Sequence, residues 1–145
     1  MKLFLLMLAG ALGAAARYGL TLAIQGWLSH RGSRTFFSAT LGTSFPLSTL
    51  IINVSGSLLL SFLATLIAHK AARPELGLIL GTGFLGAFTT FSTFELESEK
   101  LISNGQWLPA SVYILGNLVL GFMAIFIGRA IALRLLGPAV AGSTL

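Results

Sequence analysis

The chain has 145 residues, of which 55% are hydrophobic and only 9% are charged, and its formal net charge is +5. A soluble globular domain carries about 25% charged residues, so this composition excludes an ordinary soluble fold and indicates a single-domain membrane protein. The chain has no cysteine, which excludes disulfides and thiolate metal sites, and its few basic residues are scattered without the runs that would predict a nucleic-acid partner.

Four segments are long and apolar enough to cross the hydrocarbon core, which takes about 20 helical residues. They are expected at about 3–28, 47–68, 76–102 and 107–133. The first opens with MKLFLLMLAGALGAAA, which is similar to a signal peptide, but the apolar run continues after Arg17 through YGLTLAIQGWL, so we expect a retained span. The sequence therefore predicts an all-α, multi-pass integral protein of the inner (plasma) membrane.

The loop charges barely distinguish the two sides of the membrane. With four spans, one side carries Lys2, Lys70, Arg73 and Arg134, and the other carries Arg31, Arg34 and Lys100. Because Lys and Arg in short loops normally set the orientation, this near balance leaves two interpretations open, a fixed orientation and insertion in both directions. Dual insertion would permit an antiparallel dimer, whose second copy would supply the wall that four helices lack around an aqueous path.

Small residues in the spans predict close helix packing. They are Gly10, Gly13 and Ala14 in the first span, Gly56 and Ser57 in the second, and Gly116 and Gly121 in the fourth. Small side chains let membrane helices approach one another closely, within one chain or between two.

Several polar residues fall inside the spans, where each needs a partner or a water-lined cavity. Arg17 lies well inside the first span, either as a snorkelling or paired residue or as part of an electropositive vestibule for anions. Asn53 and Ser57 are four residues apart on one helical face, as are Tyr113 and Asn117. Each pair predicts interhelical hydrogen bonds or, alternatively, polar groups that line a pore.

The third span contains the unusual stretch GFLGAFTTFSTF, residues 83–94. Gly81, Gly83 and Gly86, followed by Thr89 and Thr90, weaken a helix, so a break is expected here. A break in the membrane frees backbone groups that protein, water or ions must satisfy. Freed carbonyls suit a cation such as Na⁺, and freed N–H donors suit an anion.

Phenylalanines alternate with hydroxyl-bearing residues at the end of this stretch. Phe84, Phe88, Phe91 and Phe94 follow ordinary helical spacing, so a packing stripe is one interpretation. Aromatic rings have positive edges, however, and rings together with the hydroxyls of Thr90, Ser92 and Thr93 would replace the water of a small anion. Weak and repeated sites of this kind allow both entry and exit, as conduction requires.

These motifs resemble the Fluc/CrcB family of fluoride channels. GFLGAFTTFSTF resembles the third-span signature of that family, PLSTLIINVSGS its second-span pattern and AGALGAAARY its first-span pattern. The resemblance covers essentially the whole chain. Ala87 stands where the family usually has a second glycine, and Asn117 where several relatives have serine.

The resemblance implies an antiparallel, dual-topology homodimer with two fluoride pores, each lined by both subunits, and a third helix broken at the membrane centre. It implies a structural Na⁺ at the centre of the dimer interface, held by the backbone carbonyls of Gly86 and Thr89. The pore residues implied are Phe91, Phe94, Asn53, Thr90, Ser92, Thr93, Tyr113 and Asn117, with Arg17 near the aqueous vestibule.

Two other functions compete with a fluoride channel. A small dual-topology multidrug exporter would need a buried carboxylate, but Glu75, Glu95, Glu97 and Glu99 fall at span ends or in the last turns of the third span. A nonconducting membrane assembly subunit would use the polar positions for packing alone. No nucleophile–base pair, metal cluster or phosphate-binding loop is apparent in the sequence, so we do not expect an enzyme.

Overall fold

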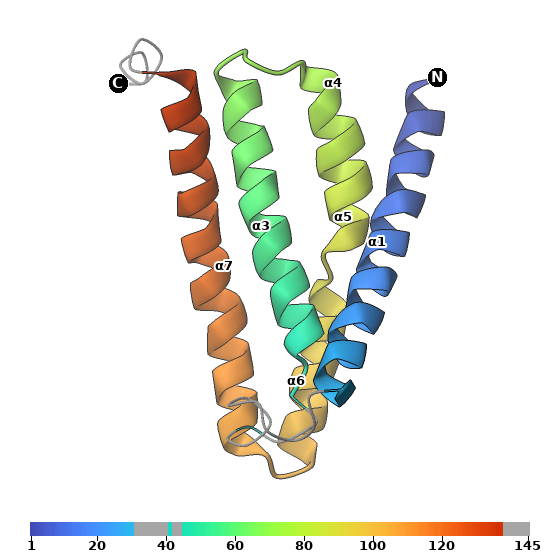
Figure 1. The fold of residues 1–145 in the computed structure, drawn as a ribbon, viewed down its shortest axis with the longest axis vertical. Helices are drawn as coiled ribbons and strands as arrows, with labels where there is room; N and C mark the ends of the chain where they lie inside the picture. Colours follow the sequence, from blue (N-terminus) through green and yellow to red (C-terminus); the bar gives the residue numbers. More distant parts are fainter. Residues whose placement is uncertain (31–40, 42–44, 138–145) are drawn as a thin grey trace.

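The computed structural model describes residues 1–30, 41 and 45–137, which form a bundle of helices (Figure 1). The elements in chain order are α1 (Lys2–His30), α3 (Leu47–Ala68), α4 (Pro74–Leu76), η2 (Gly77–Leu85), α5 (Gly86–Phe88), α6 (Phe91–Ser103) and α7 (Trp107–Leu136). Arg31 and Arg34, which enter the loop-charge count above, lie outside the described residues.

Four helical stretches are long and apolar enough to cross a membrane, and they match the four expected spans. These stretches are Lys2–Ser29, Leu47–Ala68, Pro74–Ser103 and Trp107–Leu136. Figure 1 places the start of α1, the α3–α4 turn and the end of α7 at one end of the bundle, and the α6–α7 turn at the other. The prediction of a helical protein with four membrane-capable helices is therefore confirmed.

Helices α3 and α7 pack against each other along their length, because small residues of α7 lie against α3. A Cβ at Gly128 would overlap the carbonyl oxygen of Leu58, so only glycine fits at this crossing. Nearer the start of α7, Gly116 lies against the Leu50 side chain, where a Cβ would come to 3.7 Å. Close approach of this kind is how membrane helices gain dispersion contacts without a hydrophobic driving force.

Helix α1 packs in the same way against the segment that follows α4. A Cβ at Gly13 would overlap the carbonyl oxygen of Phe84, and a Cβ at Gly83 would lie 3.0 Å from the Ala9 side chain. Gly13, Gly56 and Gly116, which the sequence marks as close-packing positions, therefore make close contacts inside one chain.

The segment η2 is a π-helix, which the sequence pattern does not predict. It runs over GLILGTGFL, and at its end the N–H of Gly86 donates to the carbonyl of Gly81, five residues earlier. This i→i+5 bonding is wider than the α-helical pattern and is found frequently at functional sites. The π-helix leads directly into the short helix α5.

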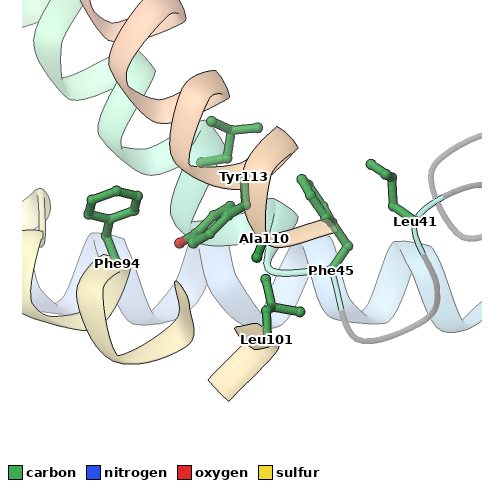
Figure 2. Packing of buried hydrophobic residues seen from close by; sticks show 7 residues of the cluster. Leu41, Phe45, Phe94, Leu101, Ala110 and Tyr113 are labelled. Atoms are coloured by element: carbon green, nitrogen blue, oxygen red, sulfur yellow. The ribbon is translucent and has the colours of Figure 1, made fainter. Parts of the chain in front are cut away.

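A buried cluster joins α6 and α7 near the end of the bundle that holds the α6–α7 turn (Figure 2). Its members are Leu41, Phe45, Leu50, Phe94, Leu101, Ala110 and Tyr113. Tyr113 is completely buried and its ring packs edge-on against Phe45, with the ring centroids 5.7 Å apart. This cluster fixes the position of Phe94, a predicted pore residue.

Candidate functional site

The backbone is extended at two residues between α5 and α6. Helix α5 ends at Phe88, Thr89 has φ −78° and ψ 159°, Thr90 has φ −150° and ψ 112°, and α6 begins at Phe91. Both threonines lie in the stretch where the Gly/Thr pattern predicts a break, and β-branched residues favour extended backbone. Figure 1 shows a short non-helical connection between α5 and α6 at this point.

The side-chain amide of Asn53 on α3 pairs with both backbone groups of Thr90. The N–H of Thr90 donates to Asn53 Oδ1 over 3.0 Å, and Asn53 Nδ2 donates to the carbonyl of Thr90 over 3.2 Å. In a continuous α-helix the Thr90 N–H would instead donate to the carbonyl of Gly86. Asn53 therefore supplies the acceptor that the Thr90 N–H would have found at Gly86 in a continuous helix, and the Gly86 carbonyl loses this helical donor.

A second amide, that of Asn117 on α7, continues this network. Asn53 Nδ2 also donates to Asn117 Oδ1 over 3.1 Å, and Asn117 Nδ2 donates to the carbonyl of Tyr113 over 3.0 Å. Both hydrogens of the Asn53 amide are thus engaged. The structure shows the interhelical bonds that the sequence offers as one interpretation of these residues, and whether they also serve an ion stays a prediction.

The hydroxyl of Thr90 organises the start of α6. Its Oγ1 accepts a hydrogen bond from the N–H of Thr93 over 3.4 Å and donates to Thr93 Oγ1 over 2.8 Å. Threonine is a favoured residue at this capping position, because its oxygen serves an N–H that has no helical acceptor. Ser92 is exposed, so of the three predicted hydroxyl residues only Thr90 and Thr93 are joined.

An open cavity of about 240 Å³ lies beside the extended residues, between α3, α6 and α7. Its lining includes Asn53, Thr89, Thr90, Phe91, Phe94 and Asn117, five of which are predicted pore residues and one a predicted sodium ligand. None of the described residues that line it is ionisable, so these residues offer an ion polar atoms and ring edges without a full charge. Thr89 packs closely against α3 at Gly56, where a Cβ would overlap the Thr89 side chain.

The two predicted pore phenylalanines differ strongly in their solvent exposure in the single chain. Phe91 is 68% exposed on the open side of the cavity, whereas Phe94 is only 8% exposed. Their ring centroids are 5.7 Å apart, and Phe94 in turn lies 5.5 Å from the ring of Tyr113. Figure 2 shows the Phe94 ring facing the hydroxyl end of Tyr113. The three rings form a continuous aromatic series from the open face into the bundle.

The carboxylate of Glu97 joins this series, although its position in the sequence indicates only an acid at the end of the third span or in its last turns. The hydroxyl of Tyr113 donates to Glu97 Oε2 over 2.6 Å. Glu97 also lines a second cavity, of about 350 Å³, at the end of the bundle, together with Lys100 and Gln25. The sequence signal for this contact is the spacing of Phe91, Phe94 and Glu97, which follow one another at intervals of three residues along one side of α6.

Arg17 lies elsewhere. It is half-buried on α1, and it does not line either of these two cavities. The described residues contain no cluster of three or more His, Cys, Asp or Glu that could hold a metal ion. The predicted sodium site uses backbone carbonyls, and carbonyl oxygens are suitable ligands for a hard cation.

Comparison with known proteins supports the family resemblance that the sequence motifs indicate. Residues 4–129 match the family described as CrcB-like protein, Camphor Resistance (CrcB). A fluoride-specific ion channel FluC of Nitratidesulfovibrio vulgaris is 44% identical over 128 residues, covering 88% of this chain and 93% of the relative. Proteins of the same name from Hydrogenobaculum sp. and Chloroflexus aurantiacus are 38% and 43% identical, covering 89% and 83% of this chain and 95% and 86% of the relatives.

Proposed function

The chain belongs to the CrcB-like family, and from this premise we propose that it is a fluoride-specific ion channel of the cell membrane. The observation that carries the proposal is 38–44% identity to fluoride-specific channels over most of both chains. Such a protein catalyses no chemical reaction. Fluoride that has accumulated in the cytoplasm leaves passively, down its own gradient.

We propose that the ion passes through the cavity beside Thr90. The support is its chemistry: a strongly hydrated anion needs donors to replace its water, but a full positive charge would hold it too long for conduction. The hydroxyls of Thr90, Ser92 and Thr93 and the ring edges of Phe91 and Phe94 are neutral groups of the required kind. We place Asn53, Tyr113 and Asn117 on the same path. Arg17, which lines neither of the two cavities described above, is proposed to attract anions at a vestibule.

We further propose that two oppositely inserted copies complete the pore. In a single chain the cavity is open on one side, and Phe91, at its edge, is 68% exposed. A second subunit that packs against this face would close the cavity and bury the ring. An antiparallel arrangement, with the third helix of each copy broken at the membrane centre, would bring the two extended segments together across the dimer axis.

The carbonyl oxygens of Gly86 and Thr89 are proposed to hold a structural Na⁺ at that axis. The residues present fit such an ion, because the Gly86 carbonyl has lost its helical donor to Asn53 and Thr89 is extended. Two carbonyls from each copy would supply four hard oxygen ligands. The ion would neutralise these dipoles and join the copies.

Fluoride efflux from liposomes that contain the purified full-length protein tests the channel function. We expect fluoride to leave rapidly without ATP or a proton gradient, while chloride is largely retained. The matched control is protein-free vesicles of the same lipid. Efflux no faster than in those vesicles would remove the proposal and favour a nonconducting assembly subunit.

A further inference from the structure

The two linked amides, Asn53 and Asn117, play unequal parts in the network. Among the described residues, both side-chain hydrogen bonds to the backbone of Thr90 come from Asn53, while Asn117 contacts Asn53 and its own helix. We propose that Asn117 is a positioning residue, which acts on the extended turn by fixing the amide of Asn53. The consequence for transport rests on the proposed function, whereas the positioning itself does not.

The direction of the hydrogen bonds follows from a group that can only accept. The carbonyl of Tyr113 accepts from Asn117 Nδ2, so the Oδ1 of Asn117 must be the atom that faces Asn53. The orientation of a side-chain amide is assigned from its partners, and here the backbone of α7 decides it. Asn117 therefore presents an acceptor to Asn53 and takes the one N–H of the Asn53 amide that Thr90 leaves free.

That acceptor matters because Asn53 lies on a membrane-spanning helix. Its Nδ2 has two hydrogens, one used by Thr90 and one by Asn117. Without Asn117, one of these hydrogens loses its partner in the half-buried interior of the bundle, where an unpaired donor is costly. The torsion that turns an asparagine amide has broad minima, so the group would rotate towards another partner and release Thr90.

The release of Thr90 would affect the proposed pore directly, because Thr90 is adjacent to Phe91. Thr90 caps α6, and the first residue of α6 is Phe91, so a looser Thr90 allows the start of α6 and its ring to shift. The freed Asn53 N–H would also face the cavity that both asparagines line, and would add a donor that retains an anion. Both effects slow the passage of fluoride.

Hydrogen–deuterium exchange at the Thr90 amide, followed by NMR on the full-length protein in micelles, measures the positioning directly. Asn117→Leu keeps the shape and removes both polar atoms, and we expect the Thr90 amide to exchange about tenfold faster or more. Asn117→Ser, the second variant, places its oxygen one bond closer to the backbone, out of reach of Asn53, and should give the same direction. Val119→Ala, at a residue of α7 that is 53% exposed, is the matched control and should leave exchange unchanged.

A double variant separates action through Asn53 from general stabilisation. If Asn117 works only by holding Asn53, adding Asn117→Leu to Asn53→Leu leaves Thr90 exchange as fast as in Asn53→Leu alone, because coupled residues are not additive. Unchanged Thr90 exchange in the Asn117 variants overturns the proposal, and so does a rise shared equally by all helical amides. Should Asn117→Leu fail to fold, Asn117→Ser decides.

Fluoride efflux completes the test and keeps the two proposals apart. In a conducting protein, we expect Asn117→Ser to lower the initial efflux rate severalfold, while Val119→Ala matches the unsubstituted chain. Faster Thr90 exchange with an unaltered efflux rate would overturn the transport consequence. A chain that carries no fluoride at all contradicts the proposed function, yet its Thr90 exchange still decides the role of Asn117.

Discussion

Phe94 and Phe91 are three positions apart in sequence, but only Phe94 has its surroundings completed within one chain. Its ring is held between Phe91 and Tyr113, with centroid distances of 5.7 and 5.5 Å, and 8% of its surface is exposed. A ring held on both sides keeps its edge in a fixed direction. In the proposed pore, Phe94 is therefore the ring whose edge is already oriented before a second copy binds.

Phe94→Ile should lower fluoride efflux from liposomes by about tenfold or more. Isoleucine fills much of the space but has no positively polarised edge, so the anion loses one of the groups that replace its water. A tenfold loss corresponds to about 1.4 kcal/mol, close to the worth of one favourable aromatic contact. Phe122→Ile is the matched control, because Phe122 lies on α7, is 63% exposed and does not line the cavity. Equal efflux from the two variants would contradict a role for the ring edge.

At the scale of whole elements, the sequence predicts some features well because the residues that cause them are neighbours in the sequence. The four spans follow from long apolar runs, and the region around Thr89 and Thr90 is marked by glycines and β-branched residues. The hydrogen-bond partner of Thr90, in contrast, could not be predicted from the sequence. Asn53 lies 37 positions away, and its spacing within α3 allows several partners, so only the packed structure selects one.

The π-helix η2 was not predictable from the sequence, because i→i+5 bonding has no side-chain period of its own. Its sequence, GLILGTGFL, also suits an ordinary buried α-helix. The role of Glu97 was missed for a similar reason. A carboxylate near the end of a span suggests solvation, and only the packing of Tyr113 against α6 turns it inward. The Glu97 contact joins two helices, whereas the π-helix depends on backbone bonding within its own segment.

The packing of α1 against η2 makes a prediction at this scale. Gly13→Ala should lower the thermal unfolding midpoint, since the added methyl overlaps the Phe84 carbonyl, and overpacking typically costs about 1–3 kcal/mol. Gly19→Ala is the matched control, because a Cβ there meets nothing within 4 Å. Both changes favour helix equally, by about 1 kcal/mol, so their difference isolates the contact. Thermal unfolding of the two purified variants in the same detergent measures it, and equal midpoints would argue against the close packing.

For the molecule as a whole, charge and shape favour the same assembly. Among the described residues, the end of the bundle with the chain start and the α3–α4 turn carries Lys2, Lys70, Arg73 and Arg134, and the other end carries Lys100. The loop-charge count from the sequence adds Arg31 and Arg34 to the second side. A difference of one charge gives the membrane little reason to prefer one orientation. In the proposed dimer, the second copy would likewise cover the open cavity and the exposed Phe91 ring.

Added lysines at one end should therefore convert the chain into a single-orientation form that does not conduct alone. Ala71→Lys with Ala72→Lys adds two charges to the α3–α4 turn, and Ser103→Lys with Asn104→Lys adds two at the opposite end, so the two forms should insert in opposite directions. Each form alone can pair only in parallel, which leaves the proposed pore incomplete, and we expect little fluoride efflux from cells that express either one. Co-expression should restore efflux, because the two forms together rebuild the antiparallel pair. Full efflux from either form alone would show that opposed copies are not required.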